Sequence, residues 1–144
     1  LLPRYRLLGL LLKELGAEKE EIEAALTERS PLEKYNDIDS ALREKFEKEL
    51  LAAVEAEYRR QRNDLLAALQ WWLRDVWLQT VSQSASKFLG FPDLAAAAQT
   101  IGKRISAADA RDNLEIVDDL QRQLSNTNVQ EALALEVGLL KLKL

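Results

Sequence analysis

The amino-acid sequence predicts an all-α domain, a helical bundle of five to six helices with one long central helix. Apolar residues recur at spacings of three and four along most of the 144-residue chain, which is the pattern of amphipathic helices. No stretch of useful length alternates apolar and polar residues with the period of two that a half-buried strand requires. Residues 38–83 contain neither proline nor glycine, so nothing there interrupts a helix.

Composition supports a packed domain and removes several kinds of chemistry. Apolar residues make up 47% of the chain and charged residues 31%, which is a globular rather than a disordered composition. The chain has no cysteine and no histidine, so disulfides, thiolate metal sites and the usual general base are excluded. The net charge is −4 and the basic residues are scattered among acidic ones, which argues against a dedicated nucleic-acid surface.

The first 37 residues are predicted to form a helical extension. Residues 2–15 are strongly apolar at helical spacing, and Gly16 stands where a C-terminal cap is expected. A short amphipathic helix over 17–27 follows, with a glutamate-rich face that we interpret as solvated, an acidic docking site being the alternative. Ser30-Pro31 interrupts the pattern, because the residue before proline avoids helical angles. Polar residues at 36–39, Asn36 among them, are N-cap candidates for the next helix.

The central helix is predicted to run from residue 38 to about residue 83. Residues seven positions apart form an apolar row along it: Leu51, Tyr58, Leu65 and Trp72. Such a row stays on one side of a helix, as in bundles and short coiled coils. Glu55 and Arg62 lie in the adjoining row, so a break near 59–64 is an alternative to one continuous helix. We interpret the row as bundle core; an intermolecular coiled coil is the alternative.

Three shorter helices are predicted after the central one. The first spans about 93–101, with Leu94 among its packing residues and Gly102 at its end. The second runs from a capping box at Ser106 to about residue 125, with inward positions at Leu114, Val117, Leu120 and Leu124. The last spans 129–143, with Asn128 as its N-cap.

Residues 65–80 contain all three tryptophans of the chain. On a helix, one broad face of this stretch carries Leu69, Trp72, Leu73 and Val76, as a core-facing helix does. Trp71 and Leu78 project from roughly the opposite side, near Arg74 and Asp75. Two explanations remain open: burial under another helix of the same domain, or a subunit interface, where tryptophan is enriched. The candidate subunit interface is therefore Trp71, Arg74 and Leu78.

No catalytic, cofactor-binding or metal-binding motif is recognisable. Gly102-Lys103 is followed by Arg104 instead of the serine or threonine that a phosphate-binding loop requires. Asp118 and Asp119 are adjacent on a helix and diverge by about 100°. We therefore expect no enzyme activity from this stretch of chain. Arg59, Arg60 and Arg62 form the one basic cluster that could follow phosphates, and we interpret it as solvated or salt-bridged, with a nucleic-acid-binding bundle as an alternative.

Two runs of sequence resemble a known family. The first is Leu69-Gln70-Trp71-Trp72-Leu73-Arg74-Asp75-Val76-Trp77-Leu78-Gln79-Thr80, followed by a Ser-rich turn and Phe91-Pro92-Asp93-Leu94. The second is Leu120-Gln121-Arg122-Gln123-Leu124-Ser125-Asn126-Thr127-Asn128-Val129-Gln130-Glu131-Ala132-Leu133-Ala134-Leu135-Glu136, continued by Val137, Leu139, Leu140 and Leu142. Together they resemble the C-terminal domain of bacterial DNA polymerase III clamp-loader subunits, of the delta-prime or gamma/tau type, over roughly residues 60–144.

The resemblance implies an oligomerisation domain, the collar, which holds the loader ring together while the ring loads a sliding clamp during DNA replication. It implies other clamp-loader subunits as partners, contacted through helix faces, and a cytoplasmic location without a membrane. DNA and the sliding clamp would be reached only indirectly, through other domains of the subunit, and no cofactor is expected here. The chain opens without methionine and ends soon after its last helix, from which we expect a fragment of a delta-prime-like subunit.

The expected organisation is an N-terminal helical extension of unknown role over 1–37 and a collar-like domain over 38–144. The alternative function is a free-standing helical adaptor or homo-oligomerisation domain unrelated to replication.

Overall fold

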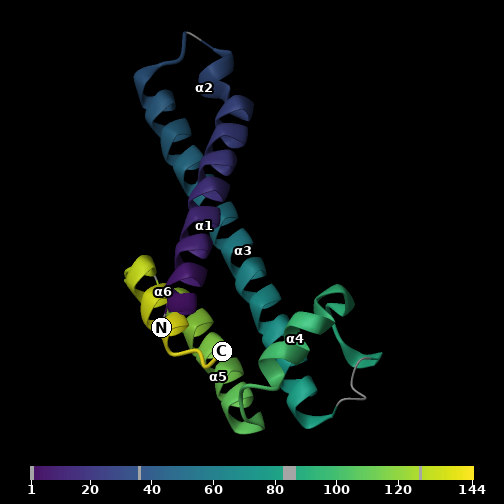
Figure 1. Cartoon of the computed structure of the whole chain (residues 1–144). Helices are drawn as coiled ribbons and strands as arrows, with labels where there is room; N and C mark the ends of the chain where they lie inside the picture. Colours follow the sequence, from purple (N-terminus) through teal and green to yellow (C-terminus); the bar gives the residue numbers. More distant parts are fainter. Residues whose placement is uncertain (1, 36, 83–86, 127) are drawn as a thin grey trace. The chain divides into compact units, whose positions relative to one another are not determined.

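The computed structural model describes residues 2–35, 37–82, 87–126 and 128–144 (Figure 1). The predicted cap at Asn36, most of the Ser-rich turn and Thr127 lie outside these ranges. The described ranges contain six α-helices and no strand: α1 Leu2–Arg29, α2 Pro31–Lys34, α3 Ser40–Val81, α4 Ala95–Gly102, α5 Ala107–Leu124 and α6 Glu131–Leu140. A 3₁₀ turn, Pro92–Leu94, precedes α4. The predicted all-α bundle with one long central helix is confirmed.

The chain divides into two compact units. Residues 1–10 and 65–144 form one, which we call the bundle unit, and residues 11–64 form the other, which we call the hairpin unit. Helices α1 and α3 contribute residues to both. Residue 37, where the sequence predicts a domain boundary, falls within the hairpin unit.

The hairpin unit consists of the remainder of α1, the short α2 and the first part of α3. The predicted helix end at Gly16 is wrong, because α1 continues to Arg29 and no glycine has a positive φ. Leu15 and Ile22 are both buried, so packing continues across the glycine and outweighs its low helix propensity. The predicted interruption at Ser30-Pro31 is confirmed: the Ser30 hydroxyl accepts a hydrogen bond from the Leu32 amide and caps α2.

Replacing Gly16 with alanine should raise the free energy of unfolding by about 0.5–1 kcal/mol. A Cβ at Gly16 would meet nothing within 4 Å, so the gain in helix propensity carries no steric penalty. Gly138→Ala is the contrasting variant, since its Cβ would lie 3.0 Å from Leu120 Cδ2. Urea unfolding followed by circular dichroism measures both, and a loss of stability in Gly16→Ala would count against a continuous α1.

Helix α3 is one uninterrupted helix of 42 residues, so the alternative of a break near 59–64 is wrong. The predicted buried row is only partly correct: Leu51 is 71% exposed and Leu65 is 36% exposed. The buried positions of α3 are Val54, Tyr58, Arg62, Leu66, Leu73, Asp75 and Val76. Between residues 54 and 66 they recur every four residues, so the buried stripe turns gradually around the helix instead of keeping a seven-residue repeat.

The core of the bundle unit lies where α5 and α6 pack together. The predicted inward residues Val117, Leu120 and Leu124 of α5 are buried, as are Leu135 and Leu139 of α6. The Ser106 capping box is also confirmed: its hydroxyl accepts from the Asp109 amide at 3.0 Å and donates to the Asp109 carboxylate at 2.8 Å.

Helix α4 packs against α3 through small residues. Ala98 is buried, and a Cβ at Gly102 would lie only 3.2 Å from Gln79 Cβ and 3.3 Å from the Val76 carbonyl oxygen. Leu94, predicted to pack, is 47% exposed, because it belongs to the 3₁₀ turn before the helix and not to α4 itself.

The last residues leave the helix and pair with α5. The predicted cap at Asn128 and the predicted end at Lys143 are wrong: α6 starts at Glu131, with Gln130 at its N-cap, and ends at Leu140. The fully buried Asn113 donates to the Lys143 carbonyl at 2.7 Å and accepts from the Lys143 amide at 2.8 Å. This pairing gives the chain end backbone partners outside a helix.

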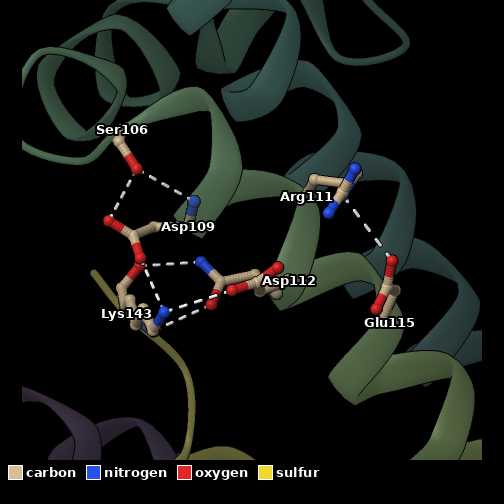
Figure 2. A network of polar contacts seen from close by, with 7 residues as sticks. Ser106, Asp109, Arg111, Asp112, Glu115 and Lys143 are labelled. Carbon is tan, nitrogen blue, oxygen red and sulfur yellow. Dashed lines mark hydrogen bonds and ion pairs between the residues drawn. The ribbon is translucent and has the colours of Figure 1, made fainter.

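An exposed ionic network accompanies this pairing. The ammonium of Lys143 contacts Asp109 at 2.6 Å and Asp112 at 3.2 Å, and Asp109 also belongs to the capping box with Ser106 (Figure 2). The hydrogen bond from Lys143 lowers the pKa of Asp109, and the same bond raises the pKa of Lys143.

Among the helices of the described ranges, none combines the length and apolar character needed to cross a membrane.

Candidate functional site

The candidate interface begins at Trp71, near the C-terminal end of α3. Its side chain is 55% exposed within the part of the chain that the structure describes. Arg74 lies one turn further along and Leu78 two turns, and both are partly exposed. Trp71 is therefore not a core residue of the described ranges, and its contact with a second subunit stays a prediction.

Trp71 borders a hollow on the surface of the bundle unit. The hollow has a volume of about 340 Å³ and is lined by Gln70, Trp71 and Arg74 of α3 and by Leu114 of α5. The sequence predicts Leu114 to point inward, but it is only partly buried and lines this hollow instead. Leu78 is not among the lining residues.

Arg74 orders the surroundings of Trp71. Its guanidinium lies over the indole, 5.3 Å from the ring centroid, in a cation–π arrangement. The same side chain donates a hydrogen bond to the Phe88 carbonyl at 3.0 Å and contacts the Asp75 carboxylate at 3.3 Å. Phe88 is 69% exposed, so Arg74 joins two exposed aromatic residues from separate segments.

Asp75 holds the loop after α3 against the helix. It is 1% exposed, although the sequence places it on the same outer side as Trp71. Its two carboxylate oxygens accept hydrogen bonds from the Gly90 amide at 3.0 Å and the Phe91 amide at 2.8 Å. Gly90 and Phe91 therefore lie against this side of α3, where Asp75 is buried.

Gly90 lies next to the tryptophan. A Cβ at this position would lie 3.5 Å from Trp71 Cε3 and 3.8 Å from both Asp75 carboxylate oxygens. These are ordinary van der Waals distances, so an alanine at this position fits without displacing the indole.

The basic cluster in the hairpin unit has internal partners. Arg60 bridges Glu57 at 2.6 Å and Asp64 at 2.9 Å. Hydrogen bonds from Arg60 and Gln61 lower the pKa of Glu57 to about 2. Arg62 is 5% exposed. Arg60 is therefore engaged by carboxylates and Arg62 is buried, so neither is presented to a phosphate backbone.

In the part of the chain that the structure describes, no three acidic, histidine or cysteine side chains gather as they would around a metal ion.

Sequence reasoning identified Trp71 and Arg74 but missed Phe88, Gly90 and the role of Asp75. One signal was present: an adjacent arginine and aspartate inside a tryptophan-rich helix, followed by a Gly-Phe-Pro turn. A carboxylate that becomes buried on an apolar helix requires hydrogen-bond donors. The backbone amides of the following turn can supply them.

Comparison of the chain with protein-family models, with curated proteins and with solved structures found no match.

Proposed function

We propose that this chain is the oligomerisation (collar) domain of a DNA polymerase III clamp-loader subunit, delta-prime-like, which holds the loader ring together for sliding-clamp loading in DNA replication. The exposed Trp71 carries the proposal, because it lies within the run of residues that resembles the family and its side chain is 55% exposed among the described residues.

The surroundings of Trp71 have the features of an interface centre. Such centres combine aromatic and arginine side chains with few other charges. Here Arg74 is fixed by Trp71, Asp75 and the Phe88 carbonyl, so little of its conformational freedom remains to be lost on binding. The adjoining hollow is a place into which a side chain of a neighbouring subunit fits.

Under this proposal the partners are other clamp-loader subunits, and Leu78 extends the contact along α3. DNA and the sliding clamp are contacted by other domains of the subunit, and neither a cofactor nor catalysis belongs to this domain. The working location is the bacterial cytoplasm.

Reconstitution with the remaining loader subunits of the source organism tests the proposal. The chain should elute with them in size-exclusion chromatography as a complex of fixed stoichiometry, and the open reading frame upstream of Leu1 should encode an AAA+ ATPase module. A chain that elutes alone at micromolar concentration would contradict the proposal. Self-association through Trp71 without binding of loader subunits would support the adaptor alternative.

A further inference from the structure

The hairpin unit has an apolar groove along one side. Two adjoining hollows of about 640 and 260 Å³ share Leu26, Arg29 and Ala53 among their lining residues and so form one continuous groove between α1 and α3. Its remaining apolar lining includes Ile22, Ala25, Phe46, Leu50 and Ala56. The charged lining is balanced, with Arg29 and Arg60 against Glu49 and Glu57, so any net charge comes from residues that flank the groove. All of these residues belong to the hairpin unit, so the groove is independent of the Trp71 surface.

The hairpin unit buries little apolar surface of its own. Only Leu15, Ile22, Val54 and Tyr58 are buried apolar side chains among its described residues. The side chains of Ala25, Ala53 and Ala56 are too small to fill the space between α1 and α3. Larger apolar side chains at these positions would contact one another across the groove. A further helix laid into the gap would bury the apolar lining, as in other helix-in-groove complexes.

Charge indicates what kind of helix fits. Residues 11–64 contain 15 acidic and 10 basic residues, whereas the rest of the chain contains 9 acidic and 10 basic residues. The negative charge of the protein is therefore concentrated in the hairpin unit.

Part of this charge lies on the groove side of α1. Glu18 and Glu21 lie seven and four residues before the groove residue Ala25, and Glu28 lies three residues after it. These spacings place all three glutamates on the same side of the helix as Ala25. All three are exposed, and none forms an ion pair within the described ranges. By contrast, Lys19, seven residues before the groove residue Leu26, is paired with Glu55 of α3 at 2.8 Å.

We propose that this groove binds a basic amphipathic α-helix of a partner protein, whose apolar face enters the groove and whose lysines or arginines meet Glu18, Glu21 and Glu28. A second copy of this chain is the poorer occupant, because twofold pairing would bring the same acidic flank against itself. The proposal is independent of the collar function.

Fluorescence anisotropy with the 144-residue chain tests it. The probe is a labelled synthetic helix of about 20 residues with leucine and alanine on one face and lysine on both flanks. The matched probe has the same apolar face and glutamate in place of lysine. The lysine peptide should bind at least about tenfold more tightly at low salt, and its binding should weaken between about 50 mM and about 500 mM NaCl.

Two pairs of variants locate the binding site. Ala53→Glu places a charge in the groove and should weaken binding about tenfold or more, whereas Ala52→Glu, one residue away and outside the lining, should not. Glu21→Gln with Glu28→Gln should weaken binding several-fold. Glu20→Gln with Glu44→Gln changes net charge equally at exposed positions outside the lining and should leave affinity unchanged.

Circular dichroism shows whether each variant is folded. If Ala53→Glu does not fold, the glutamine variants still test whether the groove binds the peptide. Equal affinity for the two peptides, equal affinity of the Ala52 and Ala53 variants, or no binding of the lysine peptide to folded protein would each overturn the proposal. Dimerisation in sedimentation velocity that Ala53→Glu abolishes would assign the groove to a second copy instead.

Discussion

Replacing Asp75 with alanine should lower the free energy of unfolding by about 3 kcal/mol. The 1% exposed carboxylate accepts hydrogen bonds from the backbone amides of Gly90 and Phe91, and hydrogen bonds to a charged group contribute about 1.5–3 kcal/mol each. Alanine would leave both amides without their acceptor and Arg74 without its carboxylate. Urea unfolding measures the change.

Asp93→Ala is the matched control, since Asp93 is an exposed aspartate of the turn that follows the same loop. Its effect should remain within about 0.5 kcal/mol. A loss below about 1 kcal/mol in Asp75→Ala would mean that the carboxylate does not hold the loop.

Replacing Asn113 with alanine should lower the free energy of unfolding by about 2–3 kcal/mol. The Asn113 side chain is fully buried and forms hydrogen bonds with both the amide and the carbonyl of Lys143. Its removal leaves these two backbone groups without a protein partner. Hydrogen exchange at the Lys143 amide provides a local readout, because protection there should be lost in the variant.

Lys143→Ala separates the two contributions at this site. It retains the backbone pairing with Asn113 and removes only the exposed contacts with Asp109 and Asp112. Its effect should be a small fraction of that of Asn113→Ala, because exposed ion pairs contribute little. If the two variants lose equal stability, the ion pairs and not the amide secure the chain end.

Local rules of sequence predicted much of the fold. The helical spacing of apolar residues predicts the all-α class. The absence of proline and glycine predicts the length of α3, and the Ser106–Asp109 spacing predicts the start of α5. Each of these signals lies within one element, where intrinsic propensity and capping decide the outcome.

Contacts between distant residues could not be predicted in the same way. Gly16 resembles a helix end, but burial of Leu15 and Ile22 carries α1 through it. Asp75 and Asn113 look like exposed polar residues, yet their partners lie 15 and 30 positions away and draw them into the interior. The exposure of Trp71 likewise depends on the positions of Gly90 and of α5. The spacing of apolar residues within one helix does not predict those positions.

Under the proposed function Trp71 contacts a neighbouring clamp-loader subunit, and a substitution at this position distinguishes that contact from a role in the stability of the chain. In Trp71→Ala the free energy of unfolding of the chain should change by less than about 1 kcal/mol, because the side chain is 55% exposed. Leu73→Ala, at a 1% exposed position of the same helix, should lose about 2–5 kcal/mol and provides the reference for a core residue.

The decisive measurement is the dissociation constant of the reconstituted loader complex, by titration of labelled chain. Loss of a buried tryptophan contact of about 2–3 kcal/mol predicts a dissociation constant about 30- to 150-fold higher for Trp71→Ala, and Leu78→Ala should change it in the same direction. Wild-type affinity in Trp71→Ala, or a loss of stability in the isolated chain equal to that of Leu73→Ala, would contradict the claim.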